Sequence, residues 1–370
     1  MAGTGFYSTV KDTAQGRWLE ILGALCPELQ EACKAGGKRH VACPIHGGDA
    51  DFRFCSKTAD DRGLSFCSCG VRDGIQLIEE IRGTDFRATM RLIADYLGLS
   101  GKSWLEQRKI AYVAKKEADK KRAQREEADR HAAIYNENKA LRIWNKCIPL
   151  ESPEAALGRR YLHKRKLDPK VVSTGIRFHP RMPLYEDQQL IGHFPALVSM
   201  VFSNRKKPIT LHRIYLDEST GKKLALAQKA KKLMPVANCT ARENRGRVIP
   251  VIAREESKIL GVAEGIETAI AANLIFGVPC WATVSAGPLV NFVPPEGIEK
   301  LVVFADQDHS GAGLEAALKL RQNLQELGWK GKVHIRLPPV EYIAKDAKGV
   351  DWADMWYQWG SIAYELKIVA

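Results

Sequence analysis

Apolar residues recur at helical intervals in the first quarter of the chain. The segment 18–25 places apolar residues three and four positions apart, and Pro27 follows it. Two further amphipathic stretches, 73–78 and 86–97, show the same spacing. Such spacing predicts helices that each bury one face. We therefore expect a first domain over residues 1–100, closed by the second and third of these helices.

The next forty residues lose this apolar pattern. Residues 101–139 are rich in Lys, Arg, Glu and Ala and hold few large apolar side chains. This composition has strong helix propensity and mixed charge. It predicts a solvated helical linker. A basic track for nucleic acid is the weaker interpretation, because Glu and Asp are interspersed among the Lys and Arg.

A globular pattern resumes near Ala140. Apolar residues alternate with polar ones over 176–180, 195–202 and 208–216, which predicts short strands. The segment 217–221, Asp-Glu-Ser-Thr-Gly, has the composition of a hairpin turn. We expect an α+β middle region over residues 140–255.

The last part of the chain, 256–370, repeats a simple unit. Each β-branched run, 259–263 and 301–305, ends in an acid and a Gly and leads into a helical pattern, the second over 316–327. A further strand is expected at 332–337. Strand, tight turn and helix in succession predict βα units on a parallel sheet. The fold class is therefore α/β here, with helices flanking the sheet. Three tryptophans at helical spacing near the end are interpreted as packing residues: Trp352, Trp356 and Trp359.

Acidic side chains follow both predicted strands. Glu264 comes after the first, and Asp306 and Asp308 come after the second. Open α/β sheets place their sites at the carboxyl ends of strands. Carboxylates gathered there repel one another unless a cation lies between them, and Mg²⁺ prefers such oxygen ligands. The alternative is structural: Glu264 caps the following helix, and Asp306 and Asp308 occupy a turn.

Two pairs of soft metal ligands lie in the first domain. Cys43 and His46 form one pair, and Cys67 and Cys69 form the other about twenty residues later. This pattern predicts a zinc ribbon, which needs its metal to fold. Only one residue separates Cys67 from Cys69, so Cys55 or His40 is an alternative ligand. A zinc-free group of buried cysteines is the structural alternative.

The charge of the chain indicates a polyanionic partner. The formal net charge is +13 and the sequence pI is about 9.3. Candidate nucleic-acid- or phosphate-binding residues are Arg53, Arg213, Lys231 and Lys232, although the basic cluster that contains the two lysines can also be a solvated face. The start of the chain lacks a signal-peptide pattern, and no run of eighteen apolar residues occurs, so we expect a reducing cytoplasm and no membrane.

These motifs resemble a known family. Glu264-Gly265 followed by Asp306-x-Asp308 is similar to the Toprim domain of DnaG-type primases, topoisomerases and some nucleases. The segment 349–354, Gly-Val-Asp-Trp-Ala-Asp, resembles an element that follows these motifs in phage and plasmid primases, with Ala353 in place of the usual Asn. The Cys43–Gly70 block resembles the zinc-binding domain of the same primases. Residues 161–167 resemble their Tyr-Leu-x-x-Arg-Gly-Leu element, with Lys166 in place of Gly.

The resemblance implies a DNA primase of a mobile element. It would synthesise short RNA primers from nucleoside triphosphates on single-stranded DNA. Mg²⁺ or Mn²⁺ would be held by Asp306, Asp308 and Asp351, and also by Asp354 and Glu264. Glu264 would either help to hold this metal or act as a general acid or base. The zinc would be structural.

Partners and rival activities follow from the same motifs. The chain offers no nucleotide-binding P-loop, so a separate replicative helicase is expected. The rivals are a Toprim enzyme that cleaves DNA and a non-catalytic DNA-binding accessory protein.

Overall fold

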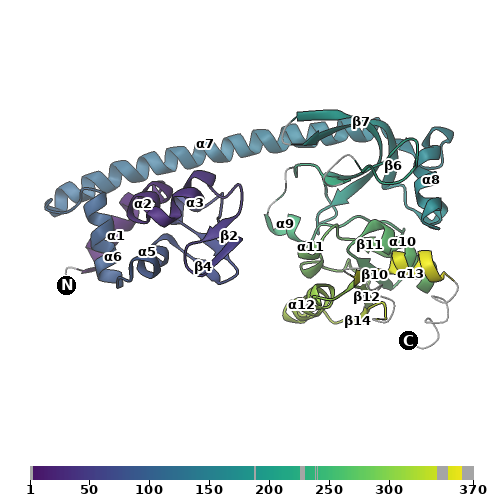
Figure 1. Ribbon diagram of the computed structural model, residues 1–370. Coiled ribbons are helices and arrows are strands. Elements are labelled where there is room, and N and C mark those ends of the chain that lie inside the picture. Colours follow the sequence, from purple (N-terminus) through teal and green to yellow (C-terminus); the bar gives the residue numbers. More distant parts are fainter. Residues whose placement is uncertain are drawn as a thin grey trace. The chain divides into compact units, whose positions relative to one another are not determined.

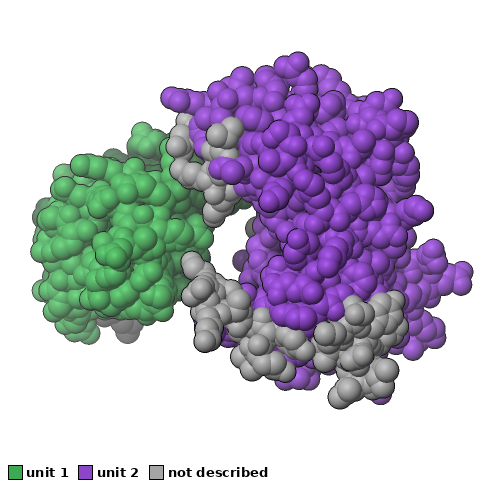
Figure 2. Space-filling model, turned by 45° about the vertical axis from the view of Figure 1, so that its right-hand side comes forward, with its two compact units in different colours: residues 1–129 green, residues 130–370 purple. Residues whose placement is uncertain are grey.

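The computed structural model describes residues 3–186, 189–225, 230–237, 239, 241–339 and 349–360. The chain forms two compact units, residues 1–129 and 130–370, shown in different colours in Figure 2. One long helix, α7 (Trp104–Asn145), has residues in both units. The four-part division expected from the sequence remains a prediction.

Short helices and a small sheet make up the first unit. Its core contains Trp18, Ile21 and Leu22 of the predicted first helix, together with Phe52 and Phe54 of the sheet. The helices are α1 (Gly3–Ala14), α2 (Trp18–Leu25), η1 (Pro27–Leu29), α3 (Gln30–Ala35), α4 (Ala59–Arg62), α5 (Gly74–Arg82) and α6 (Phe86–Tyr96). The stretches at 73–78 and 86–97 thus form α5 and α6, each starting at an Asp whose side chain accepts backbone hydrogen bonds.

The sheet of the first unit is antiparallel throughout. Its strand order is β1-β2-β3-β4. The strands are β1 (Val41–Cys43), β2 (Gly47–Phe54), β3 (Ser65–Cys67) and β4 (Gly70–Arg72). The β1–β2 and β3–β4 turns each carry part of one predicted ligand pair, which brings the two pairs to one end of the sheet.

The charged segment forms α7, as its composition predicts. The helix spans 42 residues, from Trp104 to Asn145. Ala111 and Ala118 in its first half are buried on the first unit, Ala140 near its end is buried against the middle sheet, and the stretch between is mostly exposed. Packing therefore supports both ends of this helix, and helical propensity governs the exposed stretch between them.

A five-stranded antiparallel sheet dominates the start of the second unit. Its order is β5-β6-β7-β8-β9. The elements of this region are β5 (Ile148–Pro149), η2 (Pro153–Ala155), α8 (Ala156–Lys164), η3 (Pro169–Val171), β6 (Ile176–Glu186), β7 (Gln189–Phe202), β8 (Pro208–Tyr215), β9 (Lys231–Leu233) and α9 (Ala241–Arg245). One face packs on the end of α7, and the other packs toward α8 and the parallel sheet.

The parallel sheet has four strands in the order β11-β10-β12-β14. Alternate residues of its strands belong to different cores, because neighbouring strand side chains point to opposite faces. Leu260 and Leu301 pack with α12, whereas Ala263 and Phe304 pack with α10 and α13. The elements, visible in Figure 1, are β10 (Ile259–Ala263), α10 (Ile266–Phe276), β11 (Cys280–Ala282), α11 (Ala286–Val290), β12 (Lys300–Phe304), α12 (Ala312–Glu326), β14 (Lys332–Arg336) and α13 (Trp352–Trp359).

A small two-stranded pairing extends the edge where the acids lie. β13 (Gln307–Asp308) pairs antiparallel with β15 (Gly349–Val350), and α13 follows directly. This pairing brings the predicted third acidic element beside the second one. Trp352 is buried in the core beside Phe304, which agrees with its interpretation as a packing residue.

The predicted fold class is confirmed. The second unit contains a parallel sheet flanked by helices and an antiparallel middle sheet, and the first unit contains a small sheet that carries Cys and His side chains. In the part of the chain that the structure describes, no helix is both long and apolar enough to pass through a membrane.

Candidate functional site

The predicted acids lie at the carboxyl ends of β10 and β12 and at the start of α13. Glu264 follows β10 directly and is half-buried. Helix α10 begins after Gly265, and no side chain caps it. The alternative that Glu264 is a helix cap is therefore wrong, and its carboxylate is available at the edge of the sheet.

Asp308 is held by the start of α12. Its Oδ1 accepts hydrogen bonds from Ser310 Oγ at 2.5 Å and Ala312 N at 3.2 Å, and its Oδ2 accepts one from Gly313 N at 3.1 Å. Helix N–H groups stabilise the charged carboxylate, and the pKa of Asp308 is lowered, chiefly by Ser310. These bonds also explain why α12 begins at Ala312, four residues before the pattern predicted.

Asp306 has the opposite environment. Its Oδ1 is buried without a hydrogen-bond partner. Burial, Asp351 and Glu264 together raise the pKa of Asp306 to about 7. Gly313 lies against it so closely that an added Cβ would stand 2.2 Å from the Asp306 carbonyl oxygen. The start of α12 thus packs closely against Asp306, and no cationic side chain forms an ion pair with the Asp306 carboxyl group in the part of the chain that the structure describes.

Asp351 and Asp354 form a capping box at the start of α13. Asp351 Oδ1 accepts a hydrogen bond from Asp354 N at 2.8 Å, and Asp351 N donates to Asp354 Oδ2 at 3.4 Å. Thr268 of α10 donates to Asp351 Oδ2 at 3.3 Å. Asp354 lies 4.0 Å from Arg165 of the middle region. Burial raises the pKa of Asp351, and Asp354 adds to this.

These carboxyl groups fit a hard divalent cation by their chemistry. All donors are oxygens, the pKa values of Glu264, Asp306 and Asp351 are raised, and one buried oxygen lacks a partner. They do not converge tightly here: over the described ranges, only the Cys–His group below brings three or more ligand atoms close enough for one ion. The role of the acids as metal ligands therefore remains a proposal.

A lysine of the middle sheet lies next to the acids. Lys231 of β9 forms an ion pair with Glu267 of α10, with Nζ 3.0 Å from Oε2. Its charge also lowers the pKa of Glu264 and Asp306 below what burial alone would give. The neighbouring Lys232 instead pairs with Glu186 at 3.3 Å. The carboxyl groups of Glu264, Asp306, Asp308, Asp351 and Asp354 are together called the acidic edge. Of the two predicted phosphate-binding lysines, Lys231 is the one whose charge acts on this edge.

The two predicted arginines lie in different surroundings. Arg213 of β8 donates from Nη1 to the Tyr215 hydroxyl at 3.0 Å and lies over that ring, largely covered. Arg53 of β2 is exposed, and its guanidinium lies 5.9 Å from the centroid of the Phe66 ring. Arg53, Phe66 and Val71 are cross-strand neighbours on β2, β3 and β4, and Phe66 and Val71 are exposed as well. Together they make a cationic and apolar strip on the small sheet.

The structure brings the predicted zinc ligands together. The ligand atoms of Cys43, His46, Cys67 and Cys69 all lie within 4.8 Å of one another. His46 Nε2 is 3.0 Å from Cys67 Sγ, and Cys43 Sγ is 3.8 Å from Cys69 Sγ. Burial opposes ionisation of Cys67, but hydrogen bonds from the Cys69 backbone and from His46 outweigh it and lower the pKa of Cys67 to about 6. A thiolate and an imidazole donor are what zinc prefers.

The unusual spacing of the second ligand pair is thus compatible with a Cys₃His site. Cys67 ends β3 and Gly70 begins β4 with φ +136°, so the short turn between them still turns both sulfurs inward. Cys55 and His40, the alternatives, are not members of the group.

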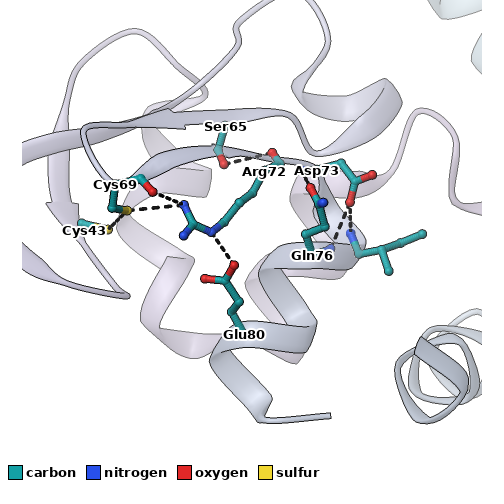
Figure 3. A network of polar contacts seen from close by, with 8 residues as sticks. Cys43, Ser65, Cys69, Arg72, Asp73, Gln76 and Glu80 are labelled. Carbon is teal, nitrogen blue, oxygen red and sulfur yellow. Dashed lines mark hydrogen bonds and ion pairs between the residues drawn. The ribbon is translucent and has the colours of Figure 1, made fainter. Parts of the chain in front are cut away.

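An arginine supports this site from outside (Figure 3). Arg72 Nη1 donates to Cys69 Sγ and to the Cys69 carbonyl, both at 3.4 Å. Its Nε is 2.7 Å from Glu80 of α5, which fixes the guanidinium. Ser65 donates to the Arg72 carbonyl at 3.1 Å. Three cysteinate ligands and one His leave bound Zn²⁺ with a net negative charge, which a guanidinium at this place offsets.

Sequence reasoning missed several of these residues. The site residues expected from the sequence do not include Glu267, Lys223, Tyr161 or Arg72. A signal existed for Tyr161 and Arg165, because both belong to the Tyr-Leu-x-x-Arg element. The structure shows that Tyr161 contacts Glu267 and Arg165 approaches Asp354. No local pattern marks Arg72, whose role depends on strand pairing.

Comparison with known families agrees with this geometry. Family models match residues 38–75 as the zinc-binding domain of primase-helicase, residues 135–242 as a domain of unknown function (DUF7146), and residues 259–361 as a Toprim domain. The chain therefore carries a Toprim domain, preceded by a zinc-binding domain of the primase-helicase type. No curated protein sequence matches the chain.

Among solved structures, several primases are similar. A DnaG primase catalytic domain bound to ssDNA shares 15% identity, with 65% of this chain and 80% of that chain covered at a TM-score of 0.43. The RNA polymerase domain of Mycobacterium tuberculosis primase DnaG shares 15% identity over 64% and 82% of the two chains, at 0.40. The primase fragment of the bacteriophage T7 primase-helicase protein shares 12% over 58% and 71%, at 0.31. These values describe a distant similarity.

Proposed function

We propose that this chain is a DNA primase that synthesises short RNA primers on single-stranded DNA, for the replication of a mobile element and with a separate helicase. The supporting observation is that Lys231, paired with Glu267 one helical turn from Glu264, acts by its charge on the Toprim carboxylates, in a chain that also carries a primase-type zinc-binding domain. Carboxylates that bind divalent cations, together with a nearby ammonium group, can neutralise the charge that develops on phosphates during nucleotidyl transfer.

The residues have distinct roles in this proposal. Asp306, Asp308 and Asp351 hold Mg²⁺ or Mn²⁺, and Asp354 and Glu264 are further candidate ligands. Bound metal would neutralise charge on the triphosphate and on the leaving pyrophosphate. Glu264, with its raised pKa, is the candidate to accept a proton from the attacking hydroxyl.

Basic residues then position the polyanions. Lys231 faces the triphosphate at the acidic edge, whereas Lys232 and Arg213 are paired on the opposite face of the same sheet and would contact phosphates of the nucleic acid there. Arg53 contacts the template on the small sheet, where the exposed Phe66 offers a stacking surface to a base. The zinc holds that sheet together and takes no part in phosphodiester formation.

One assay tests the proposal. The chain is incubated with single-stranded template, Mg²⁺ and labelled ribonucleotides, and short products are resolved. The proposal expects template-dependent RNA oligomers that the Asp306→Asn variant does not make. Nicked or shortened template would instead indicate a Toprim nuclease. Template binding without any product would indicate an accessory DNA-binding protein.

A further inference from the structure

Glu267 lies in an unusual place for an acid. It sits on α10, three residues after Glu264, and its side chain is only 4% exposed. Among the residues that the structure describes, it is the only buried Asp, Glu, Lys or Arg. Burial of a carboxylate is strongly unfavourable unless it is paired and hydrogen-bonded. The side chains that contact Glu267 therefore indicate its role.

Three side chains from separate segments of the middle region reach this carboxylate. Oε1 accepts a hydrogen bond from the Tyr161 hydroxyl of α8 at 2.7 Å and lies 2.9 Å from Lys223 Nζ. Oε2 lies 3.0 Å from Lys231 Nζ of β9. Burial opposes ionisation of Glu267, but Lys231, Lys223 and Tyr161 outweigh it, and the pKa of Glu267 falls well below its usual value. The carboxylate is charged and fully partnered.

The cluster carries an excess of positive charge. One carboxylate meets two ammonium groups, so one unit of positive charge is left over. Burial lowers the pKa of both lysines, but for Lys231 the charge of Glu267 outweighs burial, and its pKa is raised. Asp351 adds to this rise from the acidic side. Lys231 is thus held in its charged form by its ion pair with Glu267, with a further contribution from the charge of Asp351.

We propose that Glu267 is a positioning residue, which holds the Lys231 ammonium at the acidic edge so that it meets the phosphates of a nucleoside triphosphate. This inference rests on the proposed function and extends it. Its physical reason is that an exposed lysine stem has many rotamers, and an ammonium fixed by a buried carboxylate loses little further entropy on binding phosphate. Without the carboxylate, two ammonium groups would repel each other and Lys231 would turn away from the site.

The test measures binding of ATP in the presence of Mg²⁺ by calorimetry on the full chain. Glu267→Gln keeps the shape and an acceptor for Tyr161 but removes the charge. We expect about tenfold weaker ATP binding. The matched control is Glu299→Gln, which breaks the exposed 2.7 Å pair with Lys258 at the opposite, amino-terminal end of the same sheet and should leave ATP binding unchanged.

A double-mutant cycle separates positioning from a merely structural role. In a Lys231→Met background, Glu267→Gln should weaken ATP binding less than about twofold further, because the group that it positions is already gone. If Glu267→Gln still weakens ATP binding about tenfold in the Lys231→Met background, the inference is overturned. Unchanged ATP binding in Glu267→Gln alone also overturns it.

If the single variant does not fold, the double variant Glu267→Gln with Lys223→Met is used in its place. It leaves no second ammonium to repel Lys231, so we expect a smaller loss of ATP affinity, about threefold, from removal of the anchoring carboxylate alone. Unchanged ATP binding in the double variant overturns the inference.

The outcomes for this inference and for the proposed function differ. A wild-type chain that makes no primer but loses ATP affinity in Glu267→Gln contradicts the primase proposal and keeps the positioning role. A chain that makes primers and binds ATP equally well in Glu267→Gln keeps the primase proposal and contradicts the positioning role. A wild-type chain that binds no ATP contradicts both.

Discussion

At the scale of single residues, the acidic edge holds charge that the rest of the fold does not balance. Asp306 has a buried oxygen without a partner and a pKa raised to about 7, while Asp308 a few residues later has all its oxygens bonded and a lowered pKa. Two carboxylates of one motif thus have opposite environments. The buried one should respond most strongly to pH and to metal.

Replacing Asp306 by Asn should abolish primer synthesis yet stabilise the metal-free protein. The folded-state pKa lies above the unfolded value, so this group's favourable contribution is full at low pH and is lost as pH rises through about 7. At about pH 8 in a chelator, Asp306→Asn should raise the free energy of unfolding by about 1 kcal/mol or more. Denaturant titration measures it. An Asn variant less stable than wild type at about pH 8 would show that the carboxylate already has a counter-charge.

Lys166 is the second residue of interest, because its backbone is strained at the position where the Tyr-Leu-x-x-Arg-Gly-Leu element has Gly. Lys166 has φ +57°, in the left-handed region, at the end of α8. Its carbonyl accepts a hydrogen bond from Trp356 Nε1 at 2.7 Å, which ties this turn to α13. Its ammonium lies over the Tyr357 ring. The side chain therefore gains a contact while the backbone is strained.

Lys166→Gly should be more stable than Lys166→Ala by about 1 kcal/mol. Both variants lose the ammonium over Tyr357, so their difference isolates the left-handed backbone. Thermal unfolding of the two proteins measures it. Equal melting temperatures would mean that the turn relaxes to another conformation in the Ala variant.

At the scale of elements, the hydrophobic pattern predicted much of the fold. The two βα units, α5, α6 and the three middle strands follow from periodicity, and the charged helix follows from composition. What the pattern could not predict depends on side-chain bonding between distant residues. The early start of α12 comes from Asp308, and the capping box of α13 comes from Asp351 and Asp354. The acids and zinc ligands could be named from motifs, whereas the Glu267 and Arg72 contacts arise only from packing.

The zinc site offers a test at this scale. Arg72→Met should weaken zinc binding by about tenfold, because the guanidinium that offsets the charge of the Cys69 thiolate is lost. Competition with a chromophoric chelator gives the affinity. Arg39→Met, which breaks an exposed pair with Glu31 in the same unit, is the control and should bind zinc as wild type does. Equal affinity in Arg72→Met would mean that the contact with sulfur is incidental.

At the scale of the whole molecule, the hydrophobic cores separate along the chain. One cluster contains only residues of the first unit, from Val10 to Leu99, and the three others contain only residues of the second, from Ala140 onward. Removal of zinc should therefore lower the stability of the first unit and leave the stability of the second unit unchanged. The candidate zinc ligands all lie on the small sheet of the first unit, and the parallel sheet of the second unit has a core of its own.

Chelation of zinc should lower one thermal transition and leave another in place. We expect the first unit to lose stability, with weaker template binding, while the second unit melts at an unchanged temperature. Calorimetry of the full chain with and without a zinc chelator measures both transitions. A single transition that moves as a whole would show that the two units unfold cooperatively.

Asp308 and Asp351 each begin a helix in addition to their proposed role as metal ligands, and this has a consequence for the history of such proteins. Each begins a helix by accepting backbone hydrogen bonds, so selection on the fold alone would keep a capping side chain at both positions. A lineage that lost its chemistry but kept its shape should thus carry Asn, Ser or Thr there. Glu264 caps no helix and would be free to drift. An uncharged residue at 264 beside capping residues at 308 and 351 would then mark a descendant that still folds but no longer polymerises.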